Sequence, residues 1–447
     1  MKKSILLLFI FYSAFMLGQE RKQTQFTLEE AVTYAIKNNY KAINASRDIE
    51  IAKQKKWETT ASGLPQITGG LDYNRNFTLQ QQGVSGNAFN PSADPNSITT
   101  IAFGTKNSMN SRATLSQLIF DGSYIVALQA SKTYLKYFKN LNTKTNNEVR
   151  EMVTNYYGNV LLAKENITIL NRNKSILQKN LFEAEQTFKN GLIEEETVEQ
   201  LQITLASVDN NLSNITRLVD ISTKMLKITM GLDIEDPIEL TQNLDDLVLE
   251  NMSLETIGEN FNVNNNVDYL LAENFKEQRR LEYKLQRAAY LPSIAANYNL
   301  GYNSFSNNFS FFAQDQKWNF YSFLGVGINF PVFKSFGTKA KIQQAKLAYN
   351  NAETQLTEAE QMLKLQFESS KSDYEFSIKE YATSKSNLRL AEKIEGKQQI
   401  KFKEGLSTSF EFTEAQRQLY SAQQNLLQSM INVINKKTAL DKVTNKQ

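Results

Sequence analysis

The chemistry open to this chain is limited by the side chains that it lacks. Its 447 residues include no cysteine and no histidine, which removes thiol and imidazole nucleophiles and most transition-metal ligands. The rest of the sequence shows no activated nucleophile, no cluster of metal ligands and no phosphate-binding loop. We therefore expect no catalytic residue, no cofactor and no metal site, and we rank an enzyme behind every other class of function.

Two carboxylates, Glu411 and Glu414, are the candidates for an electrostatic site. They follow Gly405 by six and nine residues in a stretch with helical periodicity. By themselves, two glutamates on a helix usually mark a solvated face. The net charge of +3 is too small to indicate a nucleic-acid partner.

The element that must position these residues is a long helical hairpin that occurs twice. The first copy, residues 123–230, contains no proline, and apolar residues recur at spacings of three and four on both sides of Gly191. This period is typical of helices that bury a narrow stripe in a coiled coil. Lys174 interrupts the stripe, either to set the register or with its amine at the edge. A helix over 123–189 has a length of roughly 100 Å, which indicates a stalk, a tube wall or a fibre.

The second copy of the hairpin covers residues 338–441. The sequence FKEGL at 402–406 repeats FKNGL at 188–192 at an offset of 214 residues, and the returning helices match at the same offset. Each glycine is expected to end a helix in a left-handed conformation. Two copies of one long unit indicate a duplicated architecture.

A helix precedes the strands of each repeat. The two helices are expected over 27–64 and 252–291, and each ends at a Leu-Pro pair because the residue before a proline is pushed out of the helical region. Pro65 and Pro292 are therefore predicted helix-to-strand junctions. The asparagine pairs 38–39 and 264–265 align between the two helices at an offset of 226 residues.

Four stretches with alternating apolar and polar residues are predicted to be strands. They cover residues 66–80, 108–120, 293–304 and 318–330. Alternation rich in Tyr, Phe and Trp suits a membrane barrel with an apolar outside and a wet inside, and it also suits a soluble half-buried sheet. Trp318 is placed for an interfacial girdle. Four strands cannot close a barrel alone, so a membrane barrel requires more than one chain.

The remaining segments complete the domain organisation. Residues 1–18 have the two lysines and the short apolar core of an export signal. After this signal the sequence contains no run of about 20 apolar residues, so no membrane-spanning helix is predicted. The first repeat then covers 19–231 and the second 252–447. Between them, 232–251 is acidic and contains a proline, and we interpret it as an equatorial linker that lies against the outside of the helices and carries no chemistry.

This order of elements resembles the outer membrane efflux proteins of the TolC family over nearly the whole mature chain. The marks of the resemblance are the two Leu-Pro junctions, the paired Gly-Leu turns and the ALDK sequence at 439–442. The resemblance implies a mixed α and β fold in which each chain of a homotrimer gives four strands to a twelve-stranded transmembrane barrel. The helices of the three chains would form a coiled-coil tunnel in the periplasm.

The resemblance also implies a function and partners. The trimer would be a passive exit duct in the outer-membrane lipid of a Gram-negative bacterium. It would serve a tripartite efflux or type I secretion system, together with a periplasmic adaptor and an inner-membrane pump. The adaptor would dock at the hairpin tips, formed by Gly191, Leu192, Gly405 and Leu406.

The same resemblance assigns Glu411 and Glu414 to the periplasmic entrance. In a trimer they would form two rings of three carboxylates, which attract cations and can be blocked by them. The family closes this entrance with a tyrosine, an arginine and an aspartate, which fall on Phe402, Ser407 and Thr197 here. None of these three side chains can make the same charged links. Either the closure is weaker, or it uses nearby charges, namely Glu194, Glu195 and Glu196 with Lys401 or Lys403.

One alternative comes from a different class of protein. The chain could be a secreted or surface coiled-coil structural protein whose strands pack as a soluble sheet. Trimers that resist heating and a requirement for detergent would separate the channel from this alternative.

Overall fold

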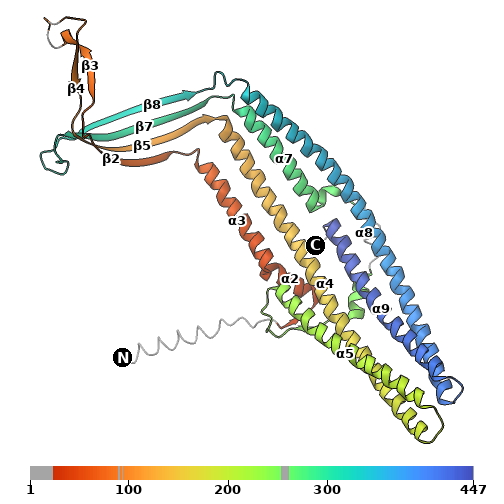
Figure 1. Ribbon diagram of the computed structural model, residues 1–447. Helices are drawn as coiled ribbons and strands as arrows, with labels where there is room; N and C mark the ends of the chain where they lie inside the picture. Colours follow the sequence, from red (N-terminus) through yellow and green to blue (C-terminus); the bar gives the residue numbers. More distant parts are fainter. Residues whose placement is uncertain (1–23, 89–90, 93, 253–260, 446–447) are drawn as a thin grey trace, which may run out of the picture. The chain divides into compact units, whose positions relative to one another are not determined.

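The computed structural model describes residues 24–88, 91–92, 94–252 and 261–445 (Figure 1). The predicted export signal, residues 1–18, lies outside the described residues. Residues 253–260, near the start of the helix predicted over 252–291, also lie outside them. The chain divides into two compact units. The first comprises Met1–Ile49, Phe138–Glu273 and Gln355–Gln447, and the second comprises Glu50–Tyr137 and Asn274–Thr354.

An antiparallel sheet organises the second unit. Its strands, in spatial order, are β2 (Gln66–Arg75), β5 (Asn107–Asp121), β7 (Ser293–Ser306) and β8 (Asn319–Asn329). Each half of the sequence contributes one antiparallel strand pair, β2 with β5 and β7 with β8, and the pairing of β5 with β7 joins the halves. β2 and β8 are the edge strands. In the connection between β2 and β5, β3 (Gln81–Ser85) and β4 (Ile98–Ala102) form a separate two-stranded sheet.

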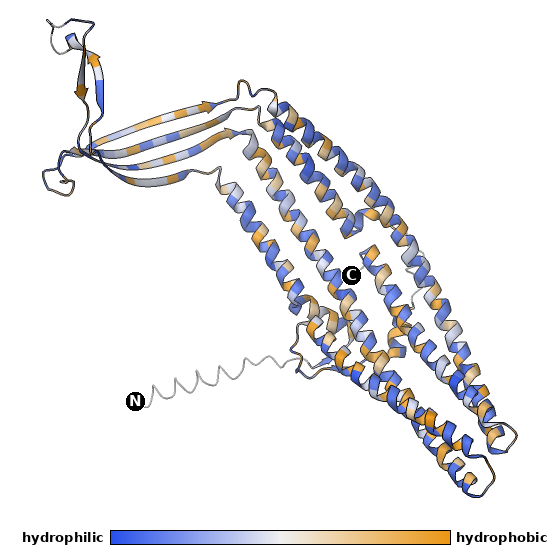
Figure 2. Ribbon diagram, in the orientation of Figure 1, coloured by the Kyte–Doolittle hydropathy of each residue, from blue (hydrophilic) through white to orange (hydrophobic). Residues whose placement is uncertain are grey.

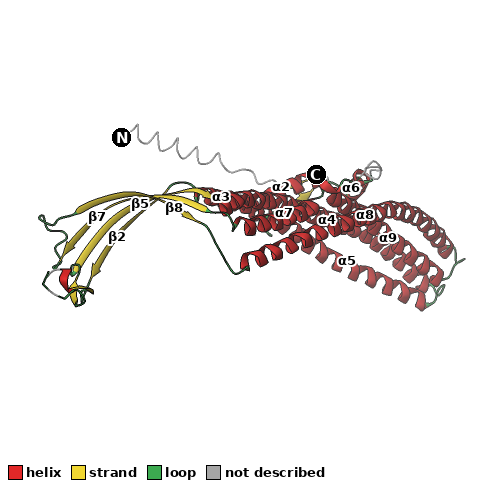
Figure 3. Cartoon of the chain, turned by 90° about the horizontal axis from the view of Figure 1, so that it is seen from above, coloured by secondary structure: helices red, strands yellow, loops and turns green. Residues whose placement is uncertain are grey.

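Two long helical hairpins follow the strand pairs (Figures 1 and 3). The first consists of α4 (Gly122–Lys189) and α5 (Glu195–Met230), and the second of α8 (Gly337–Lys403) and α9 (Ser409–Thr444). Apolar residues of the predicted stripe pack between the two arms of the first hairpin; they are Leu170, Leu177 and Ala184 from α4, and Val198, Leu201 and Val208 from α5. No helix within the described residues is both long and apolar enough to cross a lipid bilayer.

The helix predicted over 27–64 is in fact two helices, α2 (Leu28–Asn38) and α3 (Tyr40–Ala61). Asn39 separates them. Its side-chain oxygen accepts hydrogen bonds from the N–H groups of Lys41 and Ala42 at 2.8 and 3.3 Å, and its Nδ2 donates to the carbonyl of Thr229 at 2.6 Å. Asparagine is among the residues that cap a helix start best. The helix therefore restarts at this point although the apolar periodicity continues through it.

Asn266 has the same role in the second repeat, before α7 (Val267–Ala288). Its side-chain oxygen accepts from the N–H groups of Asp268 and Tyr269 at 2.8 and 3.2 Å, and its Nδ2 donates to the carbonyl of Val443 at 2.8 Å. Each asparagine thus ties the start of one helix to the last turn of a returning helix, α5 or α9. The sequence alignment had paired Asn39 with Asn265, one residue away.

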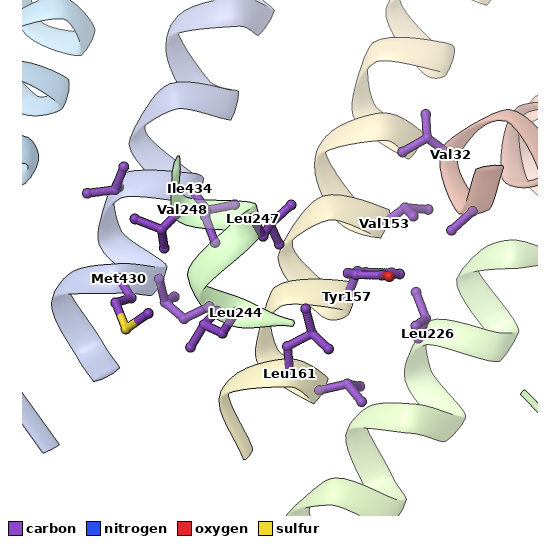
Figure 4. Packing of buried hydrophobic residues seen from close by; sticks show 14 of the residues in the cluster. Val32, Val153, Tyr157, Leu161, Leu226, Leu244, Leu247, Val248, Met430 and Ile434 are labelled. Carbon is purple, nitrogen blue, oxygen red and sulfur yellow. The ribbon is translucent and has the colours of Figure 1, made fainter. Parts of the chain in front are cut away.

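Residues 232–251, interpreted as a linker outside the helices, instead supply part of the core of the first unit. β6 (Glu239–Leu240) pairs in parallel with β1 (Gln25–Phe26). The short helix α6 (Leu244–Asn251) buries Leu244, Leu247 and Val248. Figure 4 shows these side chains beside Met430 and Ile434 of α9, within one apolar cluster. Two of the acidic residues of this segment, Asp245 and Asp246, lie exposed in the first turn of α6, where carboxylates favour the helix start.

Candidate functional site

The four-stranded sheet separates apolar from polar residues by face. Ile67, Leu115, Tyr298 and Leu324 lie opposite one another across the four strands, and all four side chains are exposed. The neighbouring row contains Gln66, Ser116, Asn297 and Gly325. Figure 2 shows the same alternation along the strands. An exposed apolar surface of this extent marks an interaction surface.

The polar face of the sheet satisfies its own polar groups. Arg112 forms an ion pair with Asp72 at 3.0 Å, and the hydroxyl of Tyr321 donates to Oδ1 of Asn110 at 3.1 Å. Phe323 is an exception, because it is exposed on this face and stacks beside Tyr321. The face as a whole is therefore suited to water.

Pro65 and Pro292 lie at the junctions from helix to strand. α3 ends at Ala61 and β2 begins at Gln66, while α7 ends at Ala288 and β7 begins at Ser293. In each case the leucine before the proline donates its N–H to the carbonyl three residues earlier, at 3.0 and 2.9 Å. The prolines thus stand where the helix stops, because neither can donate the next helical hydrogen bond.

Gly191 and Gly405 end the outgoing helices in the same way. Their φ angles are +74° and +71°, in the left-handed region that favours glycine. The N–H of the next residue donates to the carbonyl five residues earlier, at 3.2 and 2.8 Å, as in the usual glycine-terminated helix end. Leu192 and Leu406 are 75% and 78% exposed. Each hairpin tip therefore presents an exposed leucine.

Glu411 takes part in the start of α9. Its carboxylate accepts hydrogen bonds from the N–H of Thr408 at 3.0 Å and from the hydroxyl of Ser407 at 2.9 Å. In return, the N–H of Glu411 donates to the hydroxyl of Thr408 at 3.2 Å, which completes a capping box. These hydrogen bonds, the one from the Thr408 N–H above all, lower the pKa of Glu411 from its ordinary value.

Glu414 lies one turn further along α9 and has different partners. Both of its carboxylate oxygens accept hydrogen bonds from Arg417, at 2.7 and 2.8 Å, and Gln418 donates a third at 3.1 Å. The hydrogen bonds from Arg417 and then Gln418 lower the pKa of Glu414. The structure therefore places both predicted carboxylates at the start of one helix, and it adds a cation, Arg417, that the sequence argument did not include.

The three positions that correspond to the family's charged closure hold other contacts in this chain. Phe402 stacks on Phe412, with ring centroids 5.0 Å apart and an angle of 10° between the rings. Ser407 is engaged with Glu411, and Thr197 is buried in the first turn of α5. Both rings belong to the second hairpin. Phe412 also packs in the apolar cluster of the first hairpin, so this side chain joins the two hairpins near their tips.

One ion pair also joins the two hairpins near the tips. Lys403, near the tip of the second hairpin, pairs with Glu183 of α4 at 3.2 Å. The partner is therefore Glu183 and not one of the glutamates at 194–196 that the sequence suggested. Those three glutamates belong to the first turn of α5 and the residue before it, where carboxylates favour a helix start.

Lys174 pairs with Asp209 of α5 at 2.6 Å, and its side chain is about a third exposed. The amine therefore reaches the edge of the apolar stripe and finds a partner on the returning arm. Both interpretations of Lys174 apply. The edge position keeps the amine hydrated, and Asp209 is within reach at only one register of the two arms.

A row of buried asparagines lies on α4 and was not predicted from the sequence. Asn166, Asn173 and Asn180 recur every seven residues and are buried. Asn166 exchanges two hydrogen bonds with Gln424 of α9, at 3.3 and 2.8 Å, and Asn173 donates to Gln423 at 2.9 Å. The seven-residue spacing was a usable signal, but a search for apolar residues passes over amides.

Comparison with known proteins finds a family model that matches part of the chain and solved structures that share its fold. Residues 264–446 match the family described as "Outer membrane efflux protein". No curated protein matches the chain in sequence. The resemblance that was inferred from the order of the elements is therefore confirmed.

Solved outer-membrane proteins share the fold at low sequence identity. The outer membrane protein VceC from Vibrio cholerae matches with a TM-score of 0.72 and 15% identity, over 93% of this chain and 95% of that chain. The CmeC outer membrane channel of Campylobacter jejuni matches with a TM-score of 0.72 and 17% identity, over 93% and 85%. The open state of the MtrE outer membrane channel of Neisseria gonorrhoeae matches with a TM-score of 0.70 and 17% identity, over 93% and 88%.

Proposed function

Because residues 264–446 match the outer membrane efflux protein family, we propose that the chain is one subunit of a trimeric channel in the outer membrane of a Gram-negative bacterium. The channel is the passive exit duct of a tripartite efflux or type I secretion system. The observation that carries this proposal is the sheet with one exposed apolar face, one polar face and two edge strands.

Closure of the sheet requires other copies of the chain. The outer edges of β2 and β8 have no strand partner within the described residues, and unpaired backbone groups are not tolerated in a lipid bilayer. Pairing of β8 of one copy with β2 of the next, three times around, satisfies both edges. The apolar rows then face lipid and the polar rows face an aqueous lumen.

The helical unit supports the periplasmic half of the proposal. The two hairpins of each copy form part of a tunnel wall, with the tips at Leu192 and Leu406 docking a periplasmic adaptor that links the duct to an inner-membrane pump. Glu411 and Glu414 lie close to the second tip, so three copies place rings of carboxylates at the entrance.

Two neighbouring substitutions on β8 test the membrane assignment. Leu324→Arg places a charge on the apolar face, where it should cost about 2–4 kcal/mol at mid-membrane depth and reduce insertion. Gly325→Arg places the same charge on the polar face, where a Cβ meets no neighbour within 4 Å, and insertion should be normal. The measurements are heat-resistant trimers on a gel and conductance in planar lipid.

The same measurements separate the channel from the soluble structural protein. If the unchanged mature chain is a detergent-free soluble monomer that forms no pores, the channel is excluded and the coiled-coil structural protein with a soluble sheet takes its place. Equal insertion of the two arginine variants would likewise contradict the assignment of the apolar face to lipid.

A further inference from the structure

The turn between β8 and α8, residues 330–336, projects apolar side chains away from the rest of its unit. Val332, Phe333 and Phe336 are 87%, 72% and 72% exposed. The two phenylalanine rings touch each other edge to face, 5.8 Å apart. Apolar surface left in water costs roughly 25 cal/mol per Å². A turn with three such side chains is therefore expected to be covered in the functional state.

The backbone of this turn is held in an unfavourable conformation. The φ angles of Ser335 and Phe336 are +48° and +62°, a region that residues other than glycine seldom adopt and bulky ones least of all. The hydrogen bonds from Gly337 N–H to the Lys334 carbonyl at 2.9 Å, and from Ala340 N–H to the Phe336 carbonyl at 3.1 Å, hold the turn closed. The fold thus accepts strain to keep Phe336 at this position.

The first repeat has no such turn at its corresponding junction. β5 continues to Asp121 and α4 begins at the next residue. Oδ1 of Asp121 accepts the N–H of Tyr124 at 2.9 Å and so caps the helix. In the second repeat, an offset of 213 residues places Lys334 where the first has Asp121. At the same offset Val332 and Phe333 correspond to Ile119 and Phe120, whereas Phe336 corresponds to Ser123. Phe336 and the lysine are therefore features of one junction and not of the duplicated architecture.

Continuity and charge indicate what covers the turn. Val332 extends the alternate row of exposed apolar residues that runs along β8 through Val326 and Ile328 and continues with Phe330 just after the strand. Beyond it, three exposed lysines, 334, 339 and 341, form no ion pair within the part of the chain that the structure describes. Aromatic rings next to lysines at the end of an apolar band are the composition that binds the interfacial layer of a membrane.

We propose that this turn anchors each subunit in the head-group layer of the periplasmic leaflet. The rings of Phe333 and Phe336 lie at the level between acyl chains and head groups, and the lysines contact the phosphates of anionic phospholipid. The inference rests on the proposed function, since it requires the apolar face of the sheet to face lipid. It adds a lipid-binding segment outside the strands and a preference for anionic head groups.

The absence of cysteine from the chain makes a site-specific test direct. Val332→Cys keeps both aromatic rings and accepts a thiol-reactive fluorophore. Val326→Cys, on the apolar face of β8, and Gly325→Cys, on its polar face, are the controls. Each labelled trimer is reconstituted in vesicles of phosphatidylcholine and phosphatidylglycerol. Quenching by brominated lipid is then compared with quenching by aqueous iodide.

We expect brominated lipid to quench the label at 332 as it does the label at 326. Iodide should instead quench the label at 325. Brominated phosphatidylglycerol should quench the label at 332 at lower mole fraction than brominated phosphatidylcholine, by about fivefold for each lysine in contact. Lys334→Gln should remove one such factor without changing trimer formation or conductance.

Two results would overturn the inference while leaving the channel intact. Lipid quenching at 326 with only iodide quenching at 332 would place the turn in water. Lipid quenching at 326 with no quenching at 332 by either agent would show that a second copy of the chain covers the turn. Absence of lipid quenching at 326 would instead reject the proposed membrane sheet itself.

Discussion

At the scale of single residues, the glycines that end helices differ in what surrounds them. Gly231 ends α5 with a φ of +79°, and a Cβ added there would lie 2.1 Å from the carbonyl oxygen of Asn38. Gly405 has a φ of +71°, and an added Cβ would meet nothing within 4 Å. Substitution by alanine at Gly405 therefore costs free energy through the left-handed backbone conformation alone. At Gly231 it also costs free energy through the contact with Asn38.

We expect Gly405→Ala to lower the free energy of unfolding by about 1–2 kcal/mol, which is the usual cost of the left-handed conformation for a residue with a Cβ. Gly231→Ala should cost more, because the backbone near Asn38 must also move. Gly191→Ala is the matched control, since its surroundings are as open as those of Gly405. Denaturant unfolding followed by circular dichroism measures all three. Equal losses would show that the contact at Gly231 relaxes freely.

The carboxylates near the second tip allow charge to be separated from structure. Glutamine serves at the third position of a capping box as glutamate does, so Glu411→Gln should keep the start of α9 while removing the charge. Glu411→Ala removes both. Glu414→Gln removes the charge that Arg417 partly compensates. Exposed ion pairs of this kind add little stability, so the fold should change little.

The double variant Glu411→Gln/Glu414→Gln should weaken the block of single-channel conductance by multivalent cations. The pKa of each carboxyl in the folded chain lies below its ordinary value. In the unchanged channel, block should therefore persist as the pH falls into the ordinary range of a glutamate and disappear only below it. The stabilisation from the capping box is likewise present above the unfolded-state pKa and lost as the pH falls through the lowered one. Unchanged block in the double variant would remove both residues from the entrance.

At the scale of elements, α6 shows how a segment with an acidic sequence can belong to the core. Its apolar residues Leu244, Leu247 and Val248 are spaced three and four apart, which puts them on one face. That face packs into the same cluster as Tyr157 of α4 and Ile434 of α9 (Figure 4). The helix therefore connects parts of the first unit that come from both halves of the sequence.

Leu247→Ala should destabilise the first unit by about 2–5 kcal/mol, because Leu247 is fully buried and its removal leaves a cavity. Leu249→Ala, two residues further on, changes the same residue type on the exposed face of the helix and should have little effect. Thermal unfolding of the detergent-solubilised protein, followed by helical circular dichroism, compares the two. A similar midpoint for both variants would contradict a core role for α6.

At the scale of the whole molecule, the proposed duct works only if the tips engage a partner. Leu192 and Leu406 contribute little to the fold, because both are largely exposed and follow glycines that already end the helices. A change at either leucine should therefore leave folding intact and alter only what the tip contacts.

We expect Leu406→Asp to abolish export while the amount of trimer and its pore conductance stay unchanged, because a buried carboxylate without a partner would destabilise the adaptor interface. Cargo export from cells, with trimer quantified on an unheated gel, provides the measurement. Leu249→Asp, which makes the same change at an exposed leucine away from the tips, is the control. Normal export from Leu406→Asp would refute the docking role.

The sequence by itself determined the features that depend on near neighbours along the chain. Alternation along β7 and β8, the proline at each junction and the glycine at each tip act within a few residues, so their consequences are readable without knowing the fold. Their order, repeated at a long offset, was enough to indicate the family. The roles of the tip leucines and of the two glutamates stay predictions.

Tertiary structure decided the features that depend on what lies opposite. Asn39 interrupts a helix because the carbonyl of Thr229 is there to accept its amide. Asn173 is buried because Gln423 faces it, and α6 enters the core because α9 offers an apolar surface. The same sequence pattern in water would give a continuous helix, a solvated amide and an acidic linker. A buried polar group is stable only when its partner is in place, and that partner lies far along the chain.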